Sequence, residues 1–297
     1  MHILVAGWFS FEDMGATAGD LMACDVLCRW LDSRAYQYDV AFVAPFGEGV
    51  HWWDTSPDKY SHVCFVCGPF GNGWPITDFL THFSRARMIG LNLTLLQTLD
   101  EWNPFDVCYE RDSQNSQRPD ITFAANLPKV PLVGIILAHK QKEYGSKSRH
   151  AEVDVLIKSY ADTKHVTRIP IDTCLGTNAG GLRTSNEIES LIAKMDLVIT
   201  TRLHGLVLSI KNGVPAIAID AIEGGAKVSK QAEAIQWPIV IAENQLSTEA
   251  LDSAFDYCTS AEARTKALGC AARAELMIQT LSEEFLNSIG NQHPSTK

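Results

Sequence analysis

The sequence predicts an α/β fold in which two Rossmann-like domains face each other across a cleft. Short apolar runs alternate with helix-like stretches along most of the chain, an order that is typical of parallel sheets flanked by helices. The chain has 297 residues, more than one hydrophobic core usually supports, which favours two domains. Two prolines bracket a connector at residues 127–131. We therefore expect one domain over residues 1–128 and another over residues 129–297.

The first half of the chain is predicted to form one parallel sheet. Its strand candidates are the apolar runs at residues 2–6, 39–43, 62–67, 87–91 and 106–110. Apolar side chains recur at helical spacing between the first two strands, over residues 19–32. Turn signals rich in glycine and proline follow the strands, as at residues 68–73.

The second half repeats this alternation. The unbroken apolar run at residues 132–137 is typical of a strand buried on both faces of a parallel sheet. Thr184 and Glu187 have the spacing of a capping box at the start of a helix. Further strands are expected at residues 165–169, 197–201 and 215–220, and helices at 150–160, 184–194, 203–212, 226–236, 247–256 and 261–287. We expect the last helix to cross back onto the first domain.

Composition excludes some classes of partner. The formal net charge is −10, which argues against nucleic acid or an anionic membrane surface as the main partner. A local cluster of positive charge could still bind a small anion. No apolar run reaches the roughly 18 residues of a membrane span, and the N-terminus lacks the pattern of a signal peptide. The sequence therefore predicts a cytoplasmic protein that does not span a membrane.

Neither a metal site nor a cofactor is predicted. Cys64 and Cys67 form a Cys-x-x-Cys pair, but the sequence offers no second pair to complete four zinc ligands. Their alternating apolar context favours free thiols in the core. The nine histidines show no paired ligand spacing, and acidic residues do not cluster as Asp-x-Asp.

Residues 197–220 form the most specific segment of the chain. A buried strand ends at Arg202, His204 opens the next helix, and Gly213 ends that helix. Free N–H groups and the dipole at a helix N-terminus favour an anion, and arginine adds a bidentate grip on carboxylate or phosphate. Histidine can hold or give a proton near neutral pH. The alternative is structural, with Arg202 bridging to a domain partner and His204 only capping the helix.

This segment resembles the polysaccharide pyruvyl transferases. Their hallmark is a strand ending in Arg-Leu-His, then a small residue, an apolar helix and Gly-Val-Pro. The matching residues are Arg202-Leu203-His204-Gly205 and Gly213-Val214-Pro215. Weaker matches are Gly19-Asp20, the glycine cluster at residues 68–73, Arg111-Asp112-Ser113 and Lys227-Val228. The departures all lie in the first domain: Thr17-Ala18 where relatives commonly have an Asn, Pro69-Phe70 inside the glycine cluster, and Ser113 one residue early.

The resemblance implies a fold like the GT-B glycosyltransferases, with phosphoenolpyruvate as donor and a sugar or glycan as acceptor. The product would be a ketal, with the donor on the second domain and the acceptor on the first. His204 would act as the acid or stabilise charge, and Asp20 is a candidate base or a cap of the first helix. The predicted donor-binding residues are Arg202, Arg111, Leu203, Lys227, His139 and Lys140. Trp52, Trp53 and Trp74 could pack on sugar rings, although surface or interdomain packing is commoner for tryptophan.

Two other functions are compatible with the same fold. A glycosyltransferase that uses a nucleotide sugar would need an acidic residue for the ribose hydroxyls, for which Glu223 is the candidate. A non-catalytic binding protein could keep the donor pocket and lack an acceptor site. Stabilisation by phosphoenolpyruvate, by a nucleotide or by neither would separate the three functions.

Overall fold

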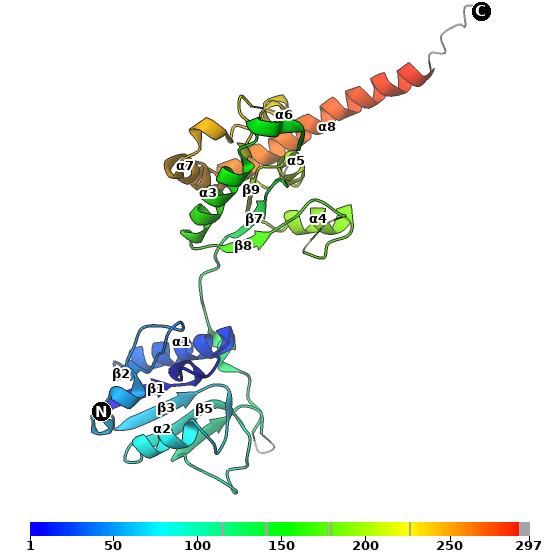
Figure 1. Ribbon diagram of the computed structural model, residues 1–297. Coiled ribbons are helices and arrows are strands. Elements are labelled where there is room, and N and C mark those ends of the chain that lie inside the picture. Colours follow the sequence, from blue (N-terminus) through cyan, green and yellow to red (C-terminus); the bar gives the residue numbers. More distant parts are fainter. Residues whose placement is uncertain (114–115, 140–141, 177, 179, 226, 291–297) are drawn as a thin grey trace, which may run out of the picture. The chain divides into compact units, whose positions relative to one another are not determined.

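A computed structural model describes residues 1–113, 116–139, 142–176, 178, 180–225 and 227–290 of the chain. The chain divides into two compact units, Met1–Pro128 (unit 1) and Lys129–Lys297 (unit 2). Each unit contains its own parallel sheet flanked by helices (Figure 1). These two sheets confirm the predicted α/β class.

The sheet of unit 1 has the strand order β2-β1-β3-β5-β4, and β6 also pairs with β5. Helix α1 covers one face through an apolar cluster that includes Ile3, Val5 and Leu27. Helix α2 covers the other face through Leu4, Phe65 and Phe79 among others. The strands are β1 (His2–Ala6), β2 (Gln37–Val40), β3 (His62–Val66), β4 (Pro69–Phe70), β5 (Arg87–Leu95) and β6 (Val107–Glu110). The helices are α1 (Ala18–Asp32) and α2 (Ile76–His82), with 3₁₀ turns η1 (Trp8–Ser10), η2 (Trp52–Asp54), η3 (Pro57–Lys59) and η4 (Ile121–Ala124).

All five strands predicted for unit 1 are present; β1 has the predicted bounds and the other four have shifted ends. Strand β2 begins two residues earlier than predicted, and β5 continues four residues further. Strand β4 and helix α2 were not predicted, because they are short and lie in or just after a stretch rich in glycine and proline. Cys64 and Cys67 are buried free thiols, as predicted.

The sheet of unit 2 has the strand order β11-β10-β9-β7-β8, and every neighbouring pair is parallel. The strands are β7 (Leu132–Ile136), β8 (Thr167–Pro170), β9 (Leu197–Thr200), β10 (Ala216–Asp220) and β11 (Val240–Ala242). The helices are α3 (His150–Asp162), α4 (Ser185–Ile192), α5 (Leu203–Lys211), α6 (Lys227–Ile235), α7 (Thr248–Cys258) and α8 (Ala261–Gly290), with 3₁₀ turns η5 (Lys142–Lys147) and η6 (Glu243–Gln245). One apolar cluster joins α3, α5, α6, α7 and α8 to the sheet, and a second joins α4 to it. The capping box of Thr184 and Glu187 at the start of α4 is confirmed.

The register of unit 2 brings several loops to one edge of the sheet. Thr200, the last residue of β9, lies opposite Ile136 at the end of β7 and opposite Ala218 near the end of β10. Pro170, which ends β8, lies opposite Ile135. The loops that follow β7, β8, β9 and β10 therefore all begin at the same carboxyl edge, where parallel α/β sheets place their ligands.

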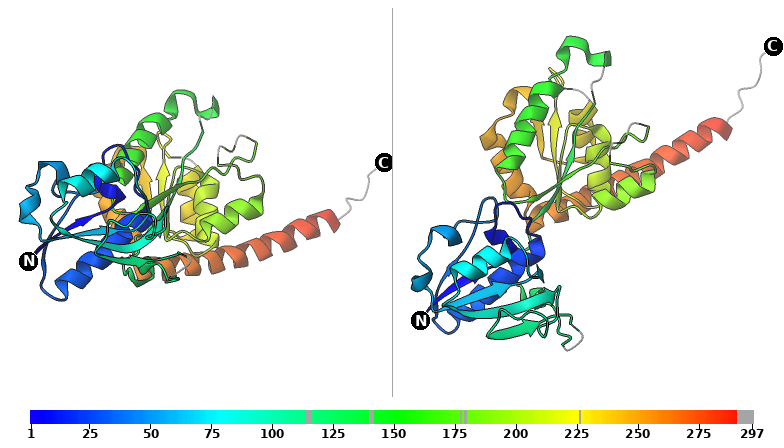
Figure 2. Two further views of the ribbon diagram at one scale, coloured as in Figure 1. Left: turned by 90° about the horizontal axis from the view of Figure 1, so that it is seen from below. Right: turned by 60° about the horizontal axis from the view of Figure 1, so that its bottom comes forward.

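Helix α8 is buried only along its first half. Ala263, Ala267 and Cys270 pack into the core of unit 2, and beyond them the helix extends past the rest of that unit (Figure 2). The large apolar side chains of the second half are exposed: Leu276, Met277, Ile278, Leu281, Phe285, Leu286 and Ile289. The expected crossing of this helix onto the first domain stays a prediction. Among the described residues, neither α8 nor any other helix combines the length and apolar character that a membrane crossing requires.

Candidate functional site

Four of the predicted site residues meet in one pocket of unit 2. The pocket has a volume of about 140 Å³ and lies at the carboxyl edge of the sheet. It is lined by Ala138, Thr201, Arg202, Leu203, His204 and Lys227. The loop after β7, the turn after β9, the first turn of α5 and the first residue of α6 therefore each contribute to it.

Two threonines shape the turn between β9 and α5. Thr200 Oγ1 donates to the carbonyl of Ile136 at 2.9 Å and accepts from the Arg202 N–H at 3.0 Å. Thr201 Oγ1 accepts from the Ala138 N–H at 2.8 Å, which ties the turn to the end of β7. A Cβ on Gly205 would lie only 2.1 Å from Thr200 Oγ1, so the turn has no room for a side chain there. The first N–H groups of α5, which begins at this turn, have no intrahelical partners.

The guanidinium of Arg202 is held by the loop that follows β8. Its Nη1 donates to Thr173 Oγ1 at 2.8 Å and to Cys174 Sγ at 3.1 Å, and lies 3.9 Å from Asp172 Oδ1. The side chain is 16% exposed. Within the described part of the chain, its buried Nε has no hydrogen-bond partner. The arginine is thus oriented in advance and retains a donor that a ligand could satisfy.

His139 contacts Asp172, which lies beside this arginine. Its Nε2 lies 2.9 Å from Asp172 Oδ2, and the other carboxylate oxygen accepts from the Cys174 N–H at 2.9 Å. Lys140, the neighbouring predicted residue, lies outside the described residues.

His139, Asp172 and Cys174 also place three possible metal ligand atoms within 4.8 Å of one another. No sequence pattern indicates this group, because its members follow two different strands. Arg202 Nη1, which is positively charged, lies 3.1 Å from the Cys174 sulfur and would repel a bound cation. We therefore assign these side chains to holding Arg202.

Charged side chains beside the pocket act on a buried histidine. His150 is 6% exposed, and its pKa is lowered by burial and further by the positive charges of Lys227 and Arg202, against the opposing charge of Asp220. Asp220 Oδ2 accepts from both the N–H and the hydroxyl of Ser229, at 3.0 and 2.7 Å. The positive charges of Arg202 and Lys227 thus both lower the pKa of His150.

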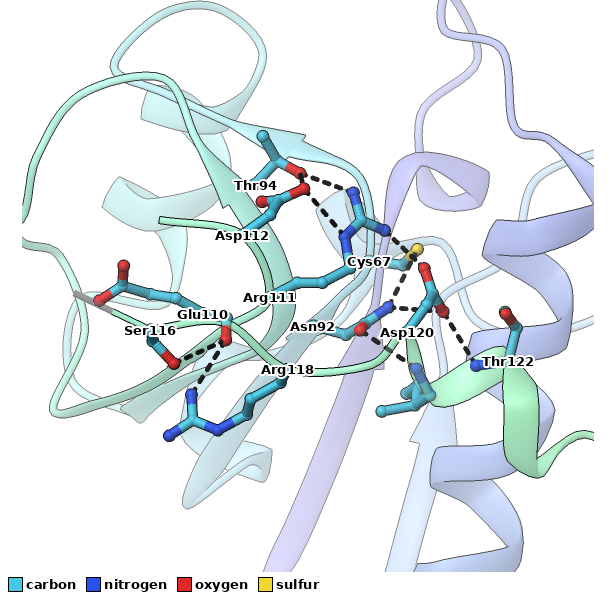
Figure 3. Close-up of polar contacts among 11 residues, drawn as sticks. Cys67, Asn92, Thr94, Glu110, Arg111, Asp112, Ser116, Arg118, Asp120 and Thr122 are labelled. Atoms are coloured by element: carbon cyan, nitrogen blue, oxygen red, sulfur yellow. Dashed lines mark hydrogen bonds and ion pairs between the residues drawn. The ribbon is translucent and has the colours of Figure 1, made fainter. Parts of the chain in front are cut away.

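Arg111, the cation predicted in unit 1, already has anionic partners (Figure 3). Its Nη1 lies 2.6 Å from Asp120 Oδ2, and its Nε lies 3.2 Å from Asp112 Oδ2. Nη2 donates to Thr94 Oγ1 at 2.6 Å. Two carboxylates therefore balance its charge, and the side chain ties the segment after β6 to β5.

Asn92 completes this network from a left-handed backbone conformation (φ 59°). Its buried amide donates to Asp120 Oδ1 at 3.1 Å and contacts Cys67 Sγ at 3.6 Å, as Figure 3 shows. Burial alone would raise the pKa of Asp120, but hydrogen bonds from Thr122, Arg111 and Asn92 outweigh it and lower that pKa. The only sequence signal for Asn92 was an amide inside an apolar strand.

Asp20 is buried in the first turn of α1. Its Oδ2 accepts from both the N–H and the hydroxyl of Thr17, each at 2.8 Å, and Thr17 in turn caps the helix. Burial and the charge of Asp20 raise the pKa of Cys67 to about 11. The structure therefore shows a capping role for Asp20, and its role as a base stays a prediction.

Glu223, the candidate ribose contact, lies on a second cavity of unit 2. It pairs with Arg149 Nη2 at 3.1 Å. The cavity, about 560 Å³ in volume, is also lined by Glu152 and Glu243. Its rim is thus mainly acidic, which disfavours the phosphates of a nucleotide.

Comparison with protein families gives a match over part of the chain. Residues 117–221 match the family model "Polysaccharide pyruvyl transferase". The predicted resemblance is confirmed over this range. The matched range contains β7, β8, β9 and β10 together with Arg202 and His204, so the polysaccharide pyruvyl transferase match includes most of the pocket.

Solved structures resemble the chain at low identity. UDP-GlcNAc 2-epimerase from Methanocaldococcus jannaschii is 10% identical, with 95% of this chain and 100% of that chain covered and a TM-score of 0.33. MurG from Acinetobacter baumannii is 11% identical, with 91% and 94% covered and a TM-score of 0.33. CalG4, the calicheamicin glycosyltransferase, is 10% identical, with 99% of each chain covered and a TM-score of 0.37. A search of curated proteins found no match.

Proposed function

We propose that the protein transfers the pyruvyl group of phosphoenolpyruvate to two hydroxyls of a sugar or glycan, as a ketal. The observation that carries this proposal is the pocket in which Arg202, His204 and Lys227 meet at the N-terminus of α5. The family match supports it, because the matched residues include Arg202 and His204. Unit 2 would then be the donor side and unit 1 the acceptor side.

The pocket suits a small ligand with two anionic groups. Phosphoenolpyruvate carries a carboxylate and a phosphate, and the planar fork of Arg202 can hold either through two parallel hydrogen bonds. The unpaired N–H groups of α5 and the charge of Lys227 favour the second anion. Binding would also satisfy the buried Nε of Arg202, removing the cost of an unpaired donor. Leu203 adds an apolar contact at the wall of the pocket.

The proposed reaction begins with protonation of the donor. A proton added to the methylene carbon makes the methyl group and leaves the adjacent carbon electron-poor. Two sugar oxygens form bonds to that carbon, and its bond to the phosphate oxygen breaks. Of the two hydroxyl protons released, one replaces the proton given to the methylene carbon and the other leaves with phosphate.

The exposed His204 lines the pocket and is our candidate for the proton donor. Asp20 is proposed as the base for a sugar hydroxyl, in competition with its capping bonds to Thr17. Arg111 is proposed to bind phosphoenolpyruvate. To do so it would have to break its ion pairs with Asp112 and Asp120. His139 acts through Asp172 on Arg202. No step requires a cofactor.

Incubation with phosphoenolpyruvate and a panel of glycans tests the proposal. We expect release of phosphate that depends on the glycan, with a new methyl signal of the ketal in the NMR spectrum. Stabilisation by a nucleotide sugar but not by phosphoenolpyruvate would instead favour a glycosyltransferase. Stabilisation by phosphoenolpyruvate without turnover on any glycan would favour a binding protein.

A further inference from the structure

Three tryptophans from two loops of unit 1 line one pocket. Trp52 and Trp53 lie in η2, and Trp74 comes shortly before α2. The pocket has a volume of about 150 Å³. Its other lining residues are Phe11, Glu12, Asp13, Pro75 and Asp78. The sequence places these aromatic side chains in different loops, and the fold gathers them.

Two of the indoles are held by packing. Trp52 lies edge-on to Phe79, with ring centroids 5.4 Å apart, and to Trp53 at 5.6 Å. Trp53 stacks on His51 at 5.0 Å. Trp74 is 61% exposed, so much of its ring is open to a ligand. The pocket therefore combines a fixed wall with an accessible aromatic surface.

Among the described residues, the carboxylates and one indole N–H of the pocket have no partner. Glu12, Asp13 and Asp78 are exposed, and over the described ranges their carboxylates make neither ion pairs nor hydrogen bonds. None of the lining residues is basic. Among the same described residues, the buried Nε1 of Trp52 also has no hydrogen-bond partner. A buried donor without a partner is costly, so a ligand oxygen that reached this group would stabilise it.

We propose that this pocket binds one sugar ring of a neutral or amino sugar and forms the acceptor subsite, the latter role resting on the proposed function. The C–H faces of a pyranose are apolar and pack against indole rings. Its hydroxyls donate to carboxylates and can accept from Trp52 Nε1. Three uncompensated carboxylates repel a uronic acid or a phosphorylated sugar. The pocket thus selects the acceptor by charge as well as by stacking.

Binding of methyl glycosides to the full chain, without phosphoenolpyruvate, tests the site by saturation-transfer NMR and calorimetry. The probes are the methyl glycosides of glucose, galactose, mannose, N-acetylglucosamine, glucosamine and glucuronic acid. We expect at least one neutral or amino glycoside to bind more tightly than the glucuronide. Trp74→Ala should weaken that binding about three- to tenfold, the loss of one aromatic contact. Trp30→Ala, which removes a 45% exposed tryptophan of α1, should leave it unchanged.

The preference of the pocket for neutral over anionic sugars is tested by a separate substitution. Asp78→Asn should narrow the difference in affinity between the neutral glycosides and the glucuronide. An aromatic pocket with carboxylates can also hold a quaternary ammonium, so choline is included as a probe. Tighter binding of choline than of every glycoside, equal binding by wild type and Trp74→Ala, or no glycoside bound would each overturn the proposal.

The acceptor role and the proposed function can fail separately. In a pyruvyl transfer assay, Trp74→Ala should raise the KM for the glycan about three- to tenfold, the factor expected for glycoside binding. It should leave kcat and the KM for phosphoenolpyruvate unchanged. If the glycoside binds at Trp74 but phosphoenolpyruvate does not bind at all, the proposed function is wrong and the sugar site stands. If transfer occurs with an unchanged glycan KM in Trp74→Ala, the acceptor subsite is wrong and the function stands.

Discussion

Arg202 Nη1 donates a hydrogen bond to Thr173 Oγ1 at 2.8 Å, across 29 positions of the sequence. The bond joins the loop after β8 to the turn after β9. It fixes one nitrogen of the guanidinium and leaves the buried Nε for a ligand. Because the orientation exists before anything binds, less conformational entropy is lost on binding.

The first prediction concerns the shape of the Arg202 side chain. Arg202→Lys keeps the charge but loses the planar fork, so it should weaken phosphoenolpyruvate binding, and Arg202→Ala should weaken it further. Loss of a charge-assisted hydrogen bond costs about 1.5–3 kcal/mol, roughly ten- to hundredfold in affinity. Calorimetric titration measures the effect. Arg264→Ala removes a 54% exposed arginine and serves as the control; equal affinity in all four proteins would show that the anion binds elsewhere.

Thr173 is expected to position Arg202 without touching the donor. Thr173→Val should raise the KM for phosphoenolpyruvate several-fold and leave kcat nearly unchanged, since only the orientation of the guanidinium is lost. Thr173→Ser restores the hydroxyl and should recover most of the loss. Steady-state kinetics separates the two parameters. A fall in kcat alone, with no change in KM, would contradict the positioning role.

His204 should matter for turnover and little for folding. Its side chain is exposed, so His204→Ala should keep the melting temperature while lowering turnover by about 10²–10⁴-fold, the range of general acid catalysis. His165→Ala removes another exposed histidine of unit 2 and should leave turnover unchanged. Normal turnover together with early melting would make His204 a structural cap.

Gly205 and Gly269 form a matched pair of helical glycines. A Cβ at Gly205 would lie 2.1 Å from Thr200 Oγ1, so Gly205→Ala must displace the turn and should destabilise unit 2 by about 1–3 kcal/mol. A Cβ at Gly269 meets nothing within 4 Å, so Gly269→Ala should stabilise α8 by roughly 0.5–1 kcal/mol. Urea denaturation measures both. Equal effects would mean that the close approach of Thr200 is not a constraint.

His150 should make stability depend on pH. Its pKa in the folded protein lies below the ordinary value of 6.5, through burial and then the charges of Lys227 and Arg202. The unfolded chain therefore binds the proton more readily, and stability falls as pH decreases through 6.5. His150→Gln should lose less stability than wild type between pH 7.5 and 5.5, measured by urea denaturation at each pH. His165→Gln is the control and should follow the wild-type slope.

Sequence patterns predicted the elements that have strong local signals. Strands β7, β9 and β10 are apolar runs, and Thr184 with Glu187 marks the start of α4. The positions of Arg202 and His204 at the sheet edge could be predicted because only two residues separate the end of β9 from the start of α5. Helix α2 and strands β4 and β11 were missed because each has too few residues to show periodicity.

The supporting side chains could not be predicted in the same way. Thr173 and Cys174 follow β8 in a loop without a recognisable motif, and they reach Arg202 because β8 and β9 flank the same strand of the sheet. Asp120 meets Arg111 nine residues away through a turn whose course no local pattern shows. Such contacts depend on which strands become neighbours and on the course of the loops, and neither has a local pattern in the sequence.

The sheet of each unit is covered on both faces by helices of that same unit. A unit with its own hydrophobic core is expected to unfold in its own cooperative step. Differential scanning calorimetry should therefore record two heat-absorption peaks, one for each unit. A molecule that binds a folded unit raises the melting temperature of that unit. Phosphoenolpyruvate should raise the temperature of the unit 2 peak, which is the peak that Gly205→Ala shifts to lower temperature. A glycoside should raise the temperature of the unit 1 peak.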